Sequence, residues 1–454
     1  MSGPLESLRE LRDCEPKAQE AWRLMERLYP ICRSITGAGV RRTLEAVAER
    51  IPLQVSEIPS GTPVFDWEVP REWNVSEAWV EDPAGRRVID LQDHSLHLMS
   101  YSTPVDAVMS LEALRAHLHA LPQHPDWIPY RTSYYRDDWG FCLTQRKLDS
   151  LSPGQYRVRI ASTLQKGHLT LAECVVPGRS TDEILIFTHT CHPALCNDNL
   201  TGIALATALA QQLLGGETPR RTFRFVFAPG TIGSITWLAH NEARVSRIRH
   251  GLVLGLLGDR GPLTYKRSRR LSAPIDRIAA YVLPQIASTA RLIDFSPYGY
   301  DERQLCSPGF NLPVGRLTRT PNNEYPEYHS SADDFSLLDE ACLAQSLQAA
   351  AALLRVADRE ETYVNLNPKC EPRLGKRGLY RPTGGTHPGE FEHALLWVLN
   401  QSDGTASLLD IAQRSALPFE VIAAAADALE DVKLLRPVAG AGSVPARLLA
   451  TGAG

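Results

Sequence analysis

Two histidines, an aspartate and several amide side chains crowd one short stretch of the sequence, His189-Thr-Cys-His-Pro-Ala-Leu-Cys-Asn-Asp-Asn-Leu-Thr-Gly202. The stretch follows an apolar run that ends at Phe187 and precedes a segment rich in Ala and Leu. Imidazole nitrogens and carboxylate oxygens are ligands that zinc prefers. Asn197, Asn199 and Thr201 are also good helix caps, but capping does not account for two histidines and an aspartate together. We therefore interpret the stretch as part of a metal site.

Two later positions could complete this site. Asp259 follows a second apolar run, and His329 lies in the loop sequence Tyr325-Pro-Glu-Tyr-His-Ser-Ser-Ala-Asp-Asp334. Taken alone, an aspartate after a strand is usually a turn former and a single histidine is usually structural. Asp259 gains weight because its strand is expected in the same sheet as the strand before His189, and ligands bind at the carboxyl ends of such strands.

The elements that must position these side chains alternate between strand and helix. Short apolar runs at 184–187, 222–228 and 251–257 predict buried strands, and the segments 202–214 and 232–244 between them have helical character. This order is typical of βαβ units and a mostly parallel sheet. A long Ala- and Leu-rich helix at 339–358 is expected to close the layer.

The remaining segments predict two further parts. Residues 16–51 read as helical, whereas residues 61–145 alternate in β-type segments punctuated by prolines, with one helix around 111–121. After a Gly-, Pro- and Arg-rich linker at 371–388, three helical patterns and a short strand predict a winged helix-turn-helix. We expect domains at 14–60 and 146–365 (one α/β domain in two parts), 61–145 (inserted, β-rich) and 385–445 (winged helix).

Composition and charge narrow the class of protein without naming its chemistry. The chain has 454 residues, with 48 basic and 52 acidic side chains and a net charge of −4, which excludes wholesale disorder and argues against a protein built to coat nucleic acid or an anionic membrane. No apolar run is long enough to span a bilayer, and the charged first residues do not resemble a signal peptide. Nine cysteines, an odd number spread along the chain, indicate reduced thiols in the cytoplasm.

The winged helix itself argues against DNA as a partner. Its expected recognition helix, residues 418–430, contains three acidic residues and no Lys or Arg, although such helices usually present basic side chains to DNA. We expect this domain to serve in packing or protein contacts instead.

The order of these motifs resembles the M28 family of zinc aminopeptidases. The shared features are His189, the sequence Asn-Asp198-Asn-Leu-Thr-Gly, the strand-end Asp259, Tyr300-Asp-Glu-Arg before a Gly-Phe-Asn-Leu-Pro turn, and Tyr-His329-Ser-Ser-Ala-Asp. More closely, the chain resembles a bacterial branch of aminopeptidase-like proteins, the DUF4910 type with a nested DUF2172 region. That resemblance rests on the segments 61–70, 129–135, 189–193, 231–234 and 258–268 and covers nearly the whole chain, including the winged helix. It implies an α/β fold with a mixed sheet flanked by helices.

The resemblance also implies roles for individual residues. It makes His189 and Asp259 ligands of one zinc ion, Asp198 a bridging carboxylate and His329 a ligand of a second zinc. The chain departs from the M28 pattern at Cys191, where the family has an aspartate, and at 228–231, which reads Ala-Pro-Gly-Thr where the family has paired glutamates. We therefore expect one zinc ion rather than two, held by His189, Asp198 and His329, with Asp259 as a further ligand or a supporting carboxylate.

The general base must then come from elsewhere. Glu302, in Tyr300-Asp-Glu-Arg303, is the first candidate, and Glu324 and Glu327, on either side of His329, are alternatives. Each of these glutamates could equally be an ion-pair partner in a solvated loop.

Two other motifs allow alternative chemistry. Cys191 and His192 could form a thiolate–imidazole nucleophile, but adjacent residues at a strand end usually point to different sides. The basic stretch 266–270 could bind an anionic group of a substrate, or could be a solvated turn.

The combined prediction is a metal-dependent, aminopeptidase-like hydrolase. We expect it to cleave an amide bond in a small peptide or an amide-bearing metabolite through zinc-bound water, with the added domains restricting access or forming contacts in a homo-oligomer. The alternatives are a non-catalytic metal- or ligand-binding protein of the same fold, a deacylase or amidohydrolase acting on a biosynthetic intermediate, and a metabolite-sensing regulator.

Overall fold

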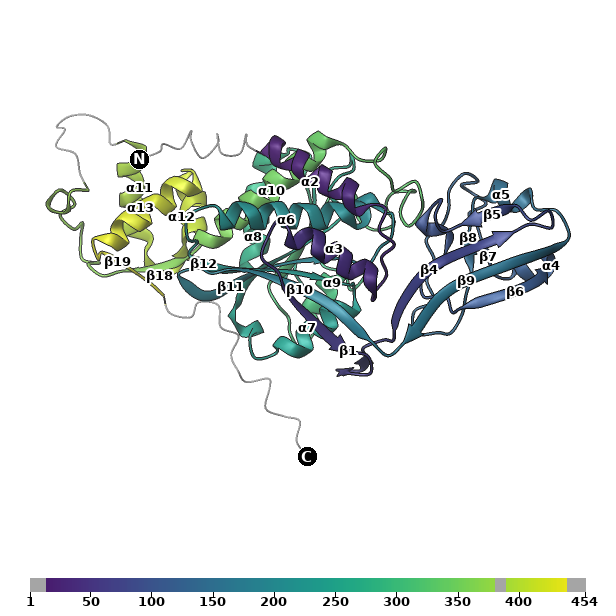
Figure 1. The fold of residues 1–454 in the computed structure, drawn as a ribbon. Coiled ribbons are helices and arrows are strands. Elements are labelled where there is room, and N and C mark those ends of the chain that lie inside the picture. The colour runs from purple at the N-terminus through teal and green to yellow at the C-terminus, as the bar shows by residue number, and fades with distance from the viewer. Residues whose placement is uncertain (1–13, 380–388, 439–454) are drawn as a thin grey trace. The chain divides into compact units, whose positions relative to one another are not determined.

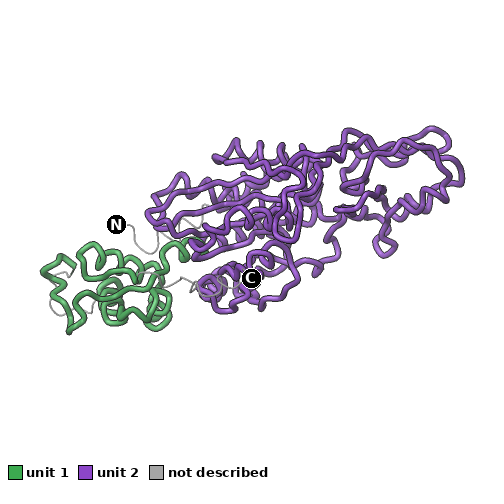
Figure 2. Tube along the Cα trace, turned by 90° about the horizontal axis from the view of Figure 1, so that it is seen from below, with its two compact units in different colours: residues 1–12, 352–454 green, residues 13–351 purple. Residues whose placement is uncertain are grey.

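The computed structural model describes residues 14–379 and 389–438. The chain divides into two compact units, one covering residues 13–351 and the other beginning at residue 352 (Figure 2). Parts of the expected linker (380–388) and of the expected winged-helix range (385–388 and 439–445) lie outside the described residues.

The larger unit is built on an eight-stranded mixed sheet. Its order is β1 (Gln54–Pro59), β10 (His168–Val176), β12 (Arg221–Ala228), β11 (Ser180–His189), β13 (Ile248–Leu254), β16 (Val314–Thr318), β14 (Thr264–Lys266) and β15 (Arg291–Ile293). The four central strands, β12, β11, β13 and β16, are mutually parallel, and strands nearer the edges add antiparallel pairs. The predicted α/β class with a mixed sheet is therefore confirmed.

Helices cover both faces of this sheet. Helices α2 (Cys14–Leu28) and α6 (Thr201–Leu214) lie on one face, and α7 (Ile232–Asn241) lies on the other (Figure 1). The central strand β11 is fully buried from Ile184 onward, as expected for a parallel strand covered on both sides. The unit also contains α3 (Ala38–Ala48), α8 (Pro274–Ile286), α9 (Asp301–Leu305) and the start of α10 (Glu340–Arg359). Among the described helices, none combines the length and hydropathy that crossing a bilayer demands.

The expected helical segment 16–51 is in fact two helices separated by residues 29–37. Pro30 follows α2 and disfavours its continuation. Gly37, just before α3, has a φ of +93°, and a Cβ atom there would lie 2.0 Å from the backbone oxygen of Trp73. The turn between the helices therefore requires glycine.

A second, smaller sheet forms the nested β-rich part. Its order is β5 (Arg87–Asp90), β4 (Glu72–Glu81), β9 (Gln155–Gln165) and β6 (Val105–Ser110). Because β9 belongs to this sheet, the β-rich part extends beyond the expected boundary at residue 145. The expected helix at 111–121 is only the short α4 (Leu111–Arg115), since the chain then pairs as β7 (Leu118–His119) with β8 (Phe141–Cys142). The hairpin β2 (Pro63–Val64) and β3 (Trp67–Glu68) and helix α5 (Gln145–Asp149) complete this part.

The smaller unit is a winged helix-turn-helix. It contains α11 (Glu390–Gln401), α12 (Leu408–Ser415) and α13 (Phe419–Asp431), with a three-stranded sheet in the order β18 (Asp403–Ser407), β17 (Thr362–Asn365), β19 (Leu435–Pro437). Leu395, Ile411 and Ile422, one from each helix, are fully buried. The first strand, β17, begins at residue 362, so this unit starts earlier than the expected boundary at 385.

Candidate metal centre

The candidate metal ligands lie at the carboxyl end of the central strand β11. His189 is the last residue of this strand, and the chain then turns through His192 to a short turn, Cys196–Leu200, that carries Asp198 and leads into α6. His329 reaches the same place from a distant loop. This edge of a parallel sheet is where ligand sites of α/β folds form.

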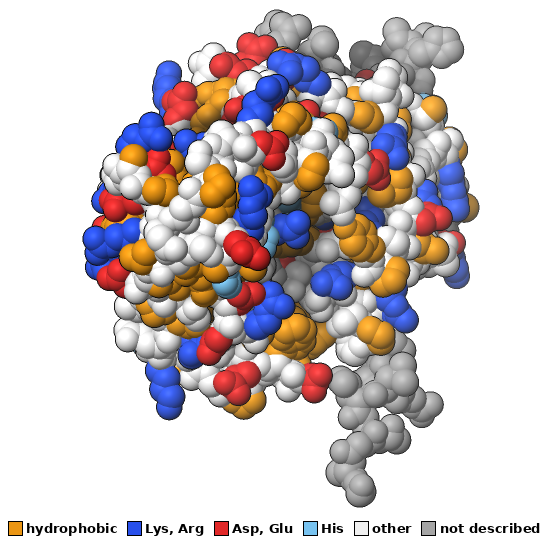
Figure 3. Space-filling view, turned by 90° about the vertical axis from the view of Figure 1, so that its right-hand side faces the viewer, with side chains coloured by type: hydrophobic (Ala, Val, Ile, Leu, Met, Phe, Trp, Pro, Cys, Tyr) orange, Lys and Arg blue, Asp and Glu red, His pale blue; other side chains and the backbone are white. Residues whose placement is uncertain are grey.

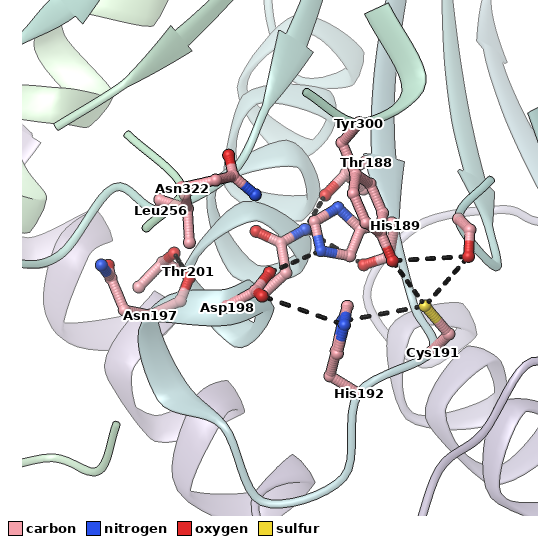
Figure 4. A network of polar contacts seen from close by, with 12 residues as sticks. Thr188, His189, Cys191, His192, Asn197, Asp198, Thr201, Leu256, Tyr300 and Asn322 are labelled. Atoms are coloured by element: carbon pink, nitrogen blue, oxygen red, sulfur yellow. Dashed lines mark hydrogen bonds and ion pairs between the residues drawn. The ribbon is translucent and has the colours of Figure 1, made fainter. Parts of the chain in front are cut away.

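Three imidazoles lie around the carboxylate of Asp198; Figure 4 shows two of them, those of His189 and His192. Nε2 of His189 lies 2.7 Å from Oδ1 of Asp198, and Nε2 of His329 lies 3.1 Å from Oδ2. Nε2 of His192 lies 3.8 Å from the same Oδ2. His189, His192 and Asp198 are buried, and their nearest ligand-type atoms all lie within 4.8 Å of one another. The structure thus brings together three of the four predicted ligands and adds His192.

The protonation states of this cluster suit a metal cation. Burial lowers the pKa of His192 to about 3, so its imidazole is neutral and offers a lone pair. Burial alone would raise the pKa of Asp198, but the neighbouring histidines hold it well below its usual value. A neutral imidazole and an ionised carboxylate are the forms that bind metal ions. The donor set of nitrogens and one carboxylate fits zinc.

A buried carboxylate lies behind His189. Nδ1 of His189 and Oδ2 of Asp301 are both buried without a hydrogen-bond partner, and they face each other at 3.9 Å. The other oxygen of Asp301 accepts a hydrogen bond from Ser234 at 2.7 Å, and burial raises the pKa of Asp301 to about 6. A carboxylate facing the second nitrogen of a histidine is the usual support of a metal-binding imidazole, because it fixes the tautomer.

Glu302, the predicted general base, does not face this cluster. Its carboxylate lies 2.9 Å from Nζ of Lys266 and 3.8 Å from Nη1 of Arg316. Burial would raise its pKa, but Arg316 and Lys266 lower the pKa below the usual value. The geometry therefore gives Glu302 an ion-pairing role. Because Lys266 is already paired with Glu302, it is not available to bind a substrate anion, which was one of the two interpretations of the basic stretch 266–270.

The two alternative bases are placed elsewhere as well. Glu324 is exposed, with an ion pair of 3.4 Å to Arg291, and neither Glu324 nor Glu327 lines the cavity described below.

Asp259 is separate from the three imidazoles and positions a neighbour of Asp198 instead. Its carboxylate accepts hydrogen bonds from the side chain of Asn197 at 3.0 Å, from the backbone of Gly261 at 2.8 Å, and from both the backbone and hydroxyl of Thr320. With this many donors already bound, Asp259 acts as a support for the ligand loop.

Asp333 supports the same loop from the other side. Its two oxygens accept the backbone N–H groups of Asn197 and Asp198 at 2.6 and 3.0 Å. Arg33, which no sequence signal singled out, donates from Nε to the backbone oxygen of His192 at 2.9 Å and is fully buried. Three buried side chains, those of Asp259, Asp333 and Arg33, thus support the loop that carries the ligands.

Cys191 contacts His192 but is not a nucleophile of the thiolate type. Sγ of Cys191 lies 3.7 Å from Nδ1 of His192, so the expectation that the two side chains point to different sides was wrong. The hydroxyl of Tyr300 lies 3.3 Å from the same sulfur. Burial raises the pKa of Cys191 to about 12, which keeps it a neutral thiol.

The ring of Tyr300 lies against the segment 228–231, where the M28 pattern has the paired glutamates that this chain lacks. It packs onto Gly230, where a Cβ atom would lie 1.9 Å from the ring, and its hydroxyl lies 3.4 Å from the backbone oxygen of Gly230. Its centroid is 4.1 Å from that of His189. Burial raises the pKa of Tyr300 well above its usual value, so the hydroxyl stays protonated.

A cavity of about 520 Å³ opens beside these side chains. His192, His329 and Tyr300 line it, together with Tyr130, Arg131 and Tyr134 from the β-rich part. An antiparallel bridge between Pro129 and Ser330 joins that part to the loop of His329; its bonds include Tyr130 N to His329 O at 2.8 Å. Figure 3 shows a hollow in which histidine is visible, with both basic and acidic side chains on the surface around it.

Two family models match the chain, one in each part. Residues 22–360 match a family described as a domain of unknown function, DUF4910, and residues 361–437 match a winged helix-turn-helix family. A Clostridium acetobutylicum protein, named for polysaccharide biosynthesis and an aminopeptidase-like domain, is 49% identical over 420 residues, covering 92% of this chain and 96% of that protein. A crystal structure from C. acetobutylicum, described provisionally as a peptidase, is 46% identical with a TM-score of 0.86 and covers 96% of this chain and 100% of that one.

More distant structures share the fold. A zinc aminopeptidase from Bacillus subtilis is 13% identical with a TM-score of 0.56, covering 75% of this chain and 95% of that one. An M28 peptidase precursor from Shewanella amazonensis is 15% identical with a TM-score of 0.52, covering 77% and 96%. These identities show a common fold alone. The chain therefore belongs to the DUF4910 family and combines an aminopeptidase-like fold with a C-terminal winged helix-turn-helix.

Proposed function

We propose that this protein is a hydrolase that uses one zinc ion to cleave an amide bond in a small substrate. The observation that carries the proposal is the convergence of His189, His192 and His329 on the buried carboxylate of Asp198, at the edge of an aminopeptidase-like sheet. The fold of the distant zinc aminopeptidases supports the same chemistry.

His189, His192 and Asp198 would hold the ion. Three protein ligands with an open position is the arrangement of catalytic zinc sites. When bound, zinc polarises a carbonyl group and lowers the pKa of water. Asp301 would keep the proton of His189 on Nδ1, so that Nε2 is free to bind. Asp259 then remains a support, in contrast to the ligand role that the resemblance implied.

His329 is our candidate for proton transfer, in place of Glu302. Its side chain is 34% exposed and lines the cavity, unlike the buried ligands. Nε2 is held by Asp198, and the ring stacks on Tyr328 with centroids 3.9 Å apart. An imidazole held in one position at the wall of a substrate cavity can accept and donate protons. The protonated hydroxyl of Tyr300, which lies beside Cys191 and Gly230, would turn to donate a hydrogen bond to the substrate carbonyl.

A deacylase acting on a biosynthetic intermediate is the second candidate. The 49% identical relative is named for polysaccharide biosynthesis, and sugar precursors commonly carry acylated amino groups. The cavity volume of about 520 Å³ suits either a short peptide or one such sugar.

We also propose a cytoplasmic location. The described part of the chain contains no disulfide, and Cys191 and Cys196 lie beside the candidate metal ligands, where a reducing compartment keeps thiols intact.

The test separates ligands from the proton-transfer group. Zinc content and amine release from aminoacyl anilides and N-acetylated amino sugars are measured for the full chain and for His192→Ala, His329→Ala and His168→Ala. His192→Ala should lose both zinc and activity, whereas His329→Ala should keep zinc and lose activity by a factor of about 10²–10⁴. The exposed His168 serves as a control that changes neither. Full zinc content in His192→Ala, or full activity in His329→Ala, would refute the assignment.

A further inference from the structure

The cavity wall carries positive charge that no carboxylate neutralises. Arg131 and Arg303 both line it, and both are exposed. Within the described residues, neither guanidinium has a hydrogen bond or ion pair. Arginines close by are paired, for example Arg136 with Asp138 at 3.0 Å and Arg267 with Asp294 at 3.0 Å. The guanidinium N–H groups of these two arginines are therefore available to a ligand.

The same wall lacks acidic groups. Among the described residues, no Asp or Glu lines the cavity. The nearby acids face inward: Asp198 is surrounded by histidines, Asp301 faces His189, and Glu302 is paired with Lys266. A site that held the protonated amino terminus of a peptide would need a carboxylate at this wall. The charge pattern instead favours a negatively charged ligand.

Aromatic side chains supply a second recognition feature. Trp67, from the hairpin β2–β3, and Tyr135 line the cavity mouth and are 50% and 52% exposed. Their rings meet at 5.4 Å in an edge-to-face contact. Exposed aromatic rings of this kind at a cavity mouth offer a flat apolar surface to a ring or chain of the ligand.

We propose that the substrate is an amide that carries a carboxylate or phosphate, and that Arg131 and Arg303 bind this anionic group. That the cleaved bond is an amide rests on the function proposed above. Arg131 belongs to the β-rich part and Arg303 to α9, so the two guanidinium groups approach the cavity from different segments. Guanidinium groups bind carboxylates and phosphates with two parallel hydrogen bonds, which adds specificity as well as affinity.

Calorimetric binding to the zinc-loaded full chain tests this proposal. The probes are N-acetylglucosamine, N-acetylmuramic acid and N-acetylglucosamine 1-phosphate, which share the amide and the sugar ring and differ in the anionic group. At least one charged probe should bind at least tenfold more tightly than the neutral one, and the preferred charged probe tells carboxylate from phosphate. Arg131→Gln and Arg303→Gln should each reduce this difference, and Arg136→Gln, in the same segment as Arg131, should leave it unchanged.

Equal affinity for all three probes, no binding of either charged probe, or a difference that survives both cavity substitutions would overturn the proposal. Amine release is followed in the same samples. Tighter binding of a charged probe without amine release would count against the hydrolase and leave the anion site standing, whereas release from the neutral probe without charge preference would do the reverse. Melting curves of the variants confirm that they are folded.

Discussion

A single buried carboxylate decides how well His189 can serve as a ligand. Asp301 is the carboxylate that faces Nδ1 of His189, and a neutral amide in its place would favour the wrong tautomer about as readily as the right one. We expect Asp301→Asn to weaken zinc binding by roughly 10–100-fold, the usual effect of removing such a partner.

Competition for zinc with a chelator of known affinity measures this change. Asp294→Asn is the matched control, because Asp294 is an exposed carboxylate paired only with Arg267. Unchanged zinc affinity in Asp301→Asn would show that the contact at 3.9 Å does not support the ligand.

Some residues of the candidate site could be predicted from the sequence, and others could not. Residue types and strand ends pointed to His189, Asp198 and His329, which the structure brings together. His192 was counted in the stretch interpreted as a metal site but was not named as a ligand, because the resemblance assigned no ligand there. Alternation in an extended chain also suggested that Cys191 and His192 point to different sides; the chain instead turns after His189, with Ala194 at a φ of +40°. Asp301 and Glu302 are neighbours on a helix, where successive side chains point about 100° apart, so only the fold shows which of them faces the ligands.

At the scale of elements, one ion-pair network joins helix α3 to both sheets. Arg41 of α3 pairs with Glu57 of β1 at 2.9 Å and with Glu72 of β4 at 2.7 Å. Glu72 also accepts the backbone N–H of His168 at 2.9 Å. The hydrogen bond from Arg41 is the main reason that the pKa of Glu72 falls to about 2.

This shift predicts how acid affects stability. A carboxyl group whose pKa is about 2 when folded and about 4.5 when unfolded stabilises the fold above pH 4.5, and this contribution is lost as the pH falls from 4.5 to 2. Glu72→Gln should therefore lower the free energy of unfolding by about 1–2 kcal/mol at pH 7, and the difference should shrink across that pH window.

Urea unfolding at several pH values tests the prediction. Glu68→Gln, an exposed glutamate on the hairpin strand β3, should change little at any pH. A difference for Glu72→Gln that stays constant between pH 7 and pH 3 would contradict the proposed linkage.

Elements were predictable where local pattern and burial agree. The apolar runs of the central strands follow from burial on both faces of a parallel sheet, so β11, β12 and β13 were predicted close to their observed positions. The short strands β14 and β15, at one side of the sheet, were not predicted, because three residues are too few to show a periodic pattern and the strands depend on their neighbours for pairing. The extension of the β-rich part to β9 was missed for a similar reason: a strand's sequence does not say which of two sheets it joins.

At the scale of the whole molecule, the winged helix-turn-helix unit poses the question of whether the protein binds DNA. On α13 the exposed residues are Ala424, Asp427 and Asp431, so the helix that usually enters the major groove presents acids. We expect the full chain at about 10 μM to retard no DNA fragment in gel electrophoresis at about 50 mM salt, where non-specific electrostatic binding is strong. A basic winged-helix protein on the same gel is the control, and a retarded band for this chain would contradict the expectation.

The bridge between Pro129 and Ser330 has a consequence for protein engineering. It joins the cavity-lining segment of the β-rich part to the loop of His329, although 200 residues of sequence separate them. The two segments therefore have to be transferred together. In a chimera that takes only the β-rich part from a relative, the loop of His329 would still come from this chain. That loop would then have to pair with the relative's residues in place of Pro129 and Tyr130. Exchanges meant to change which ligand the cavity accepts should therefore carry the loop at 325–333 together with the β-rich part.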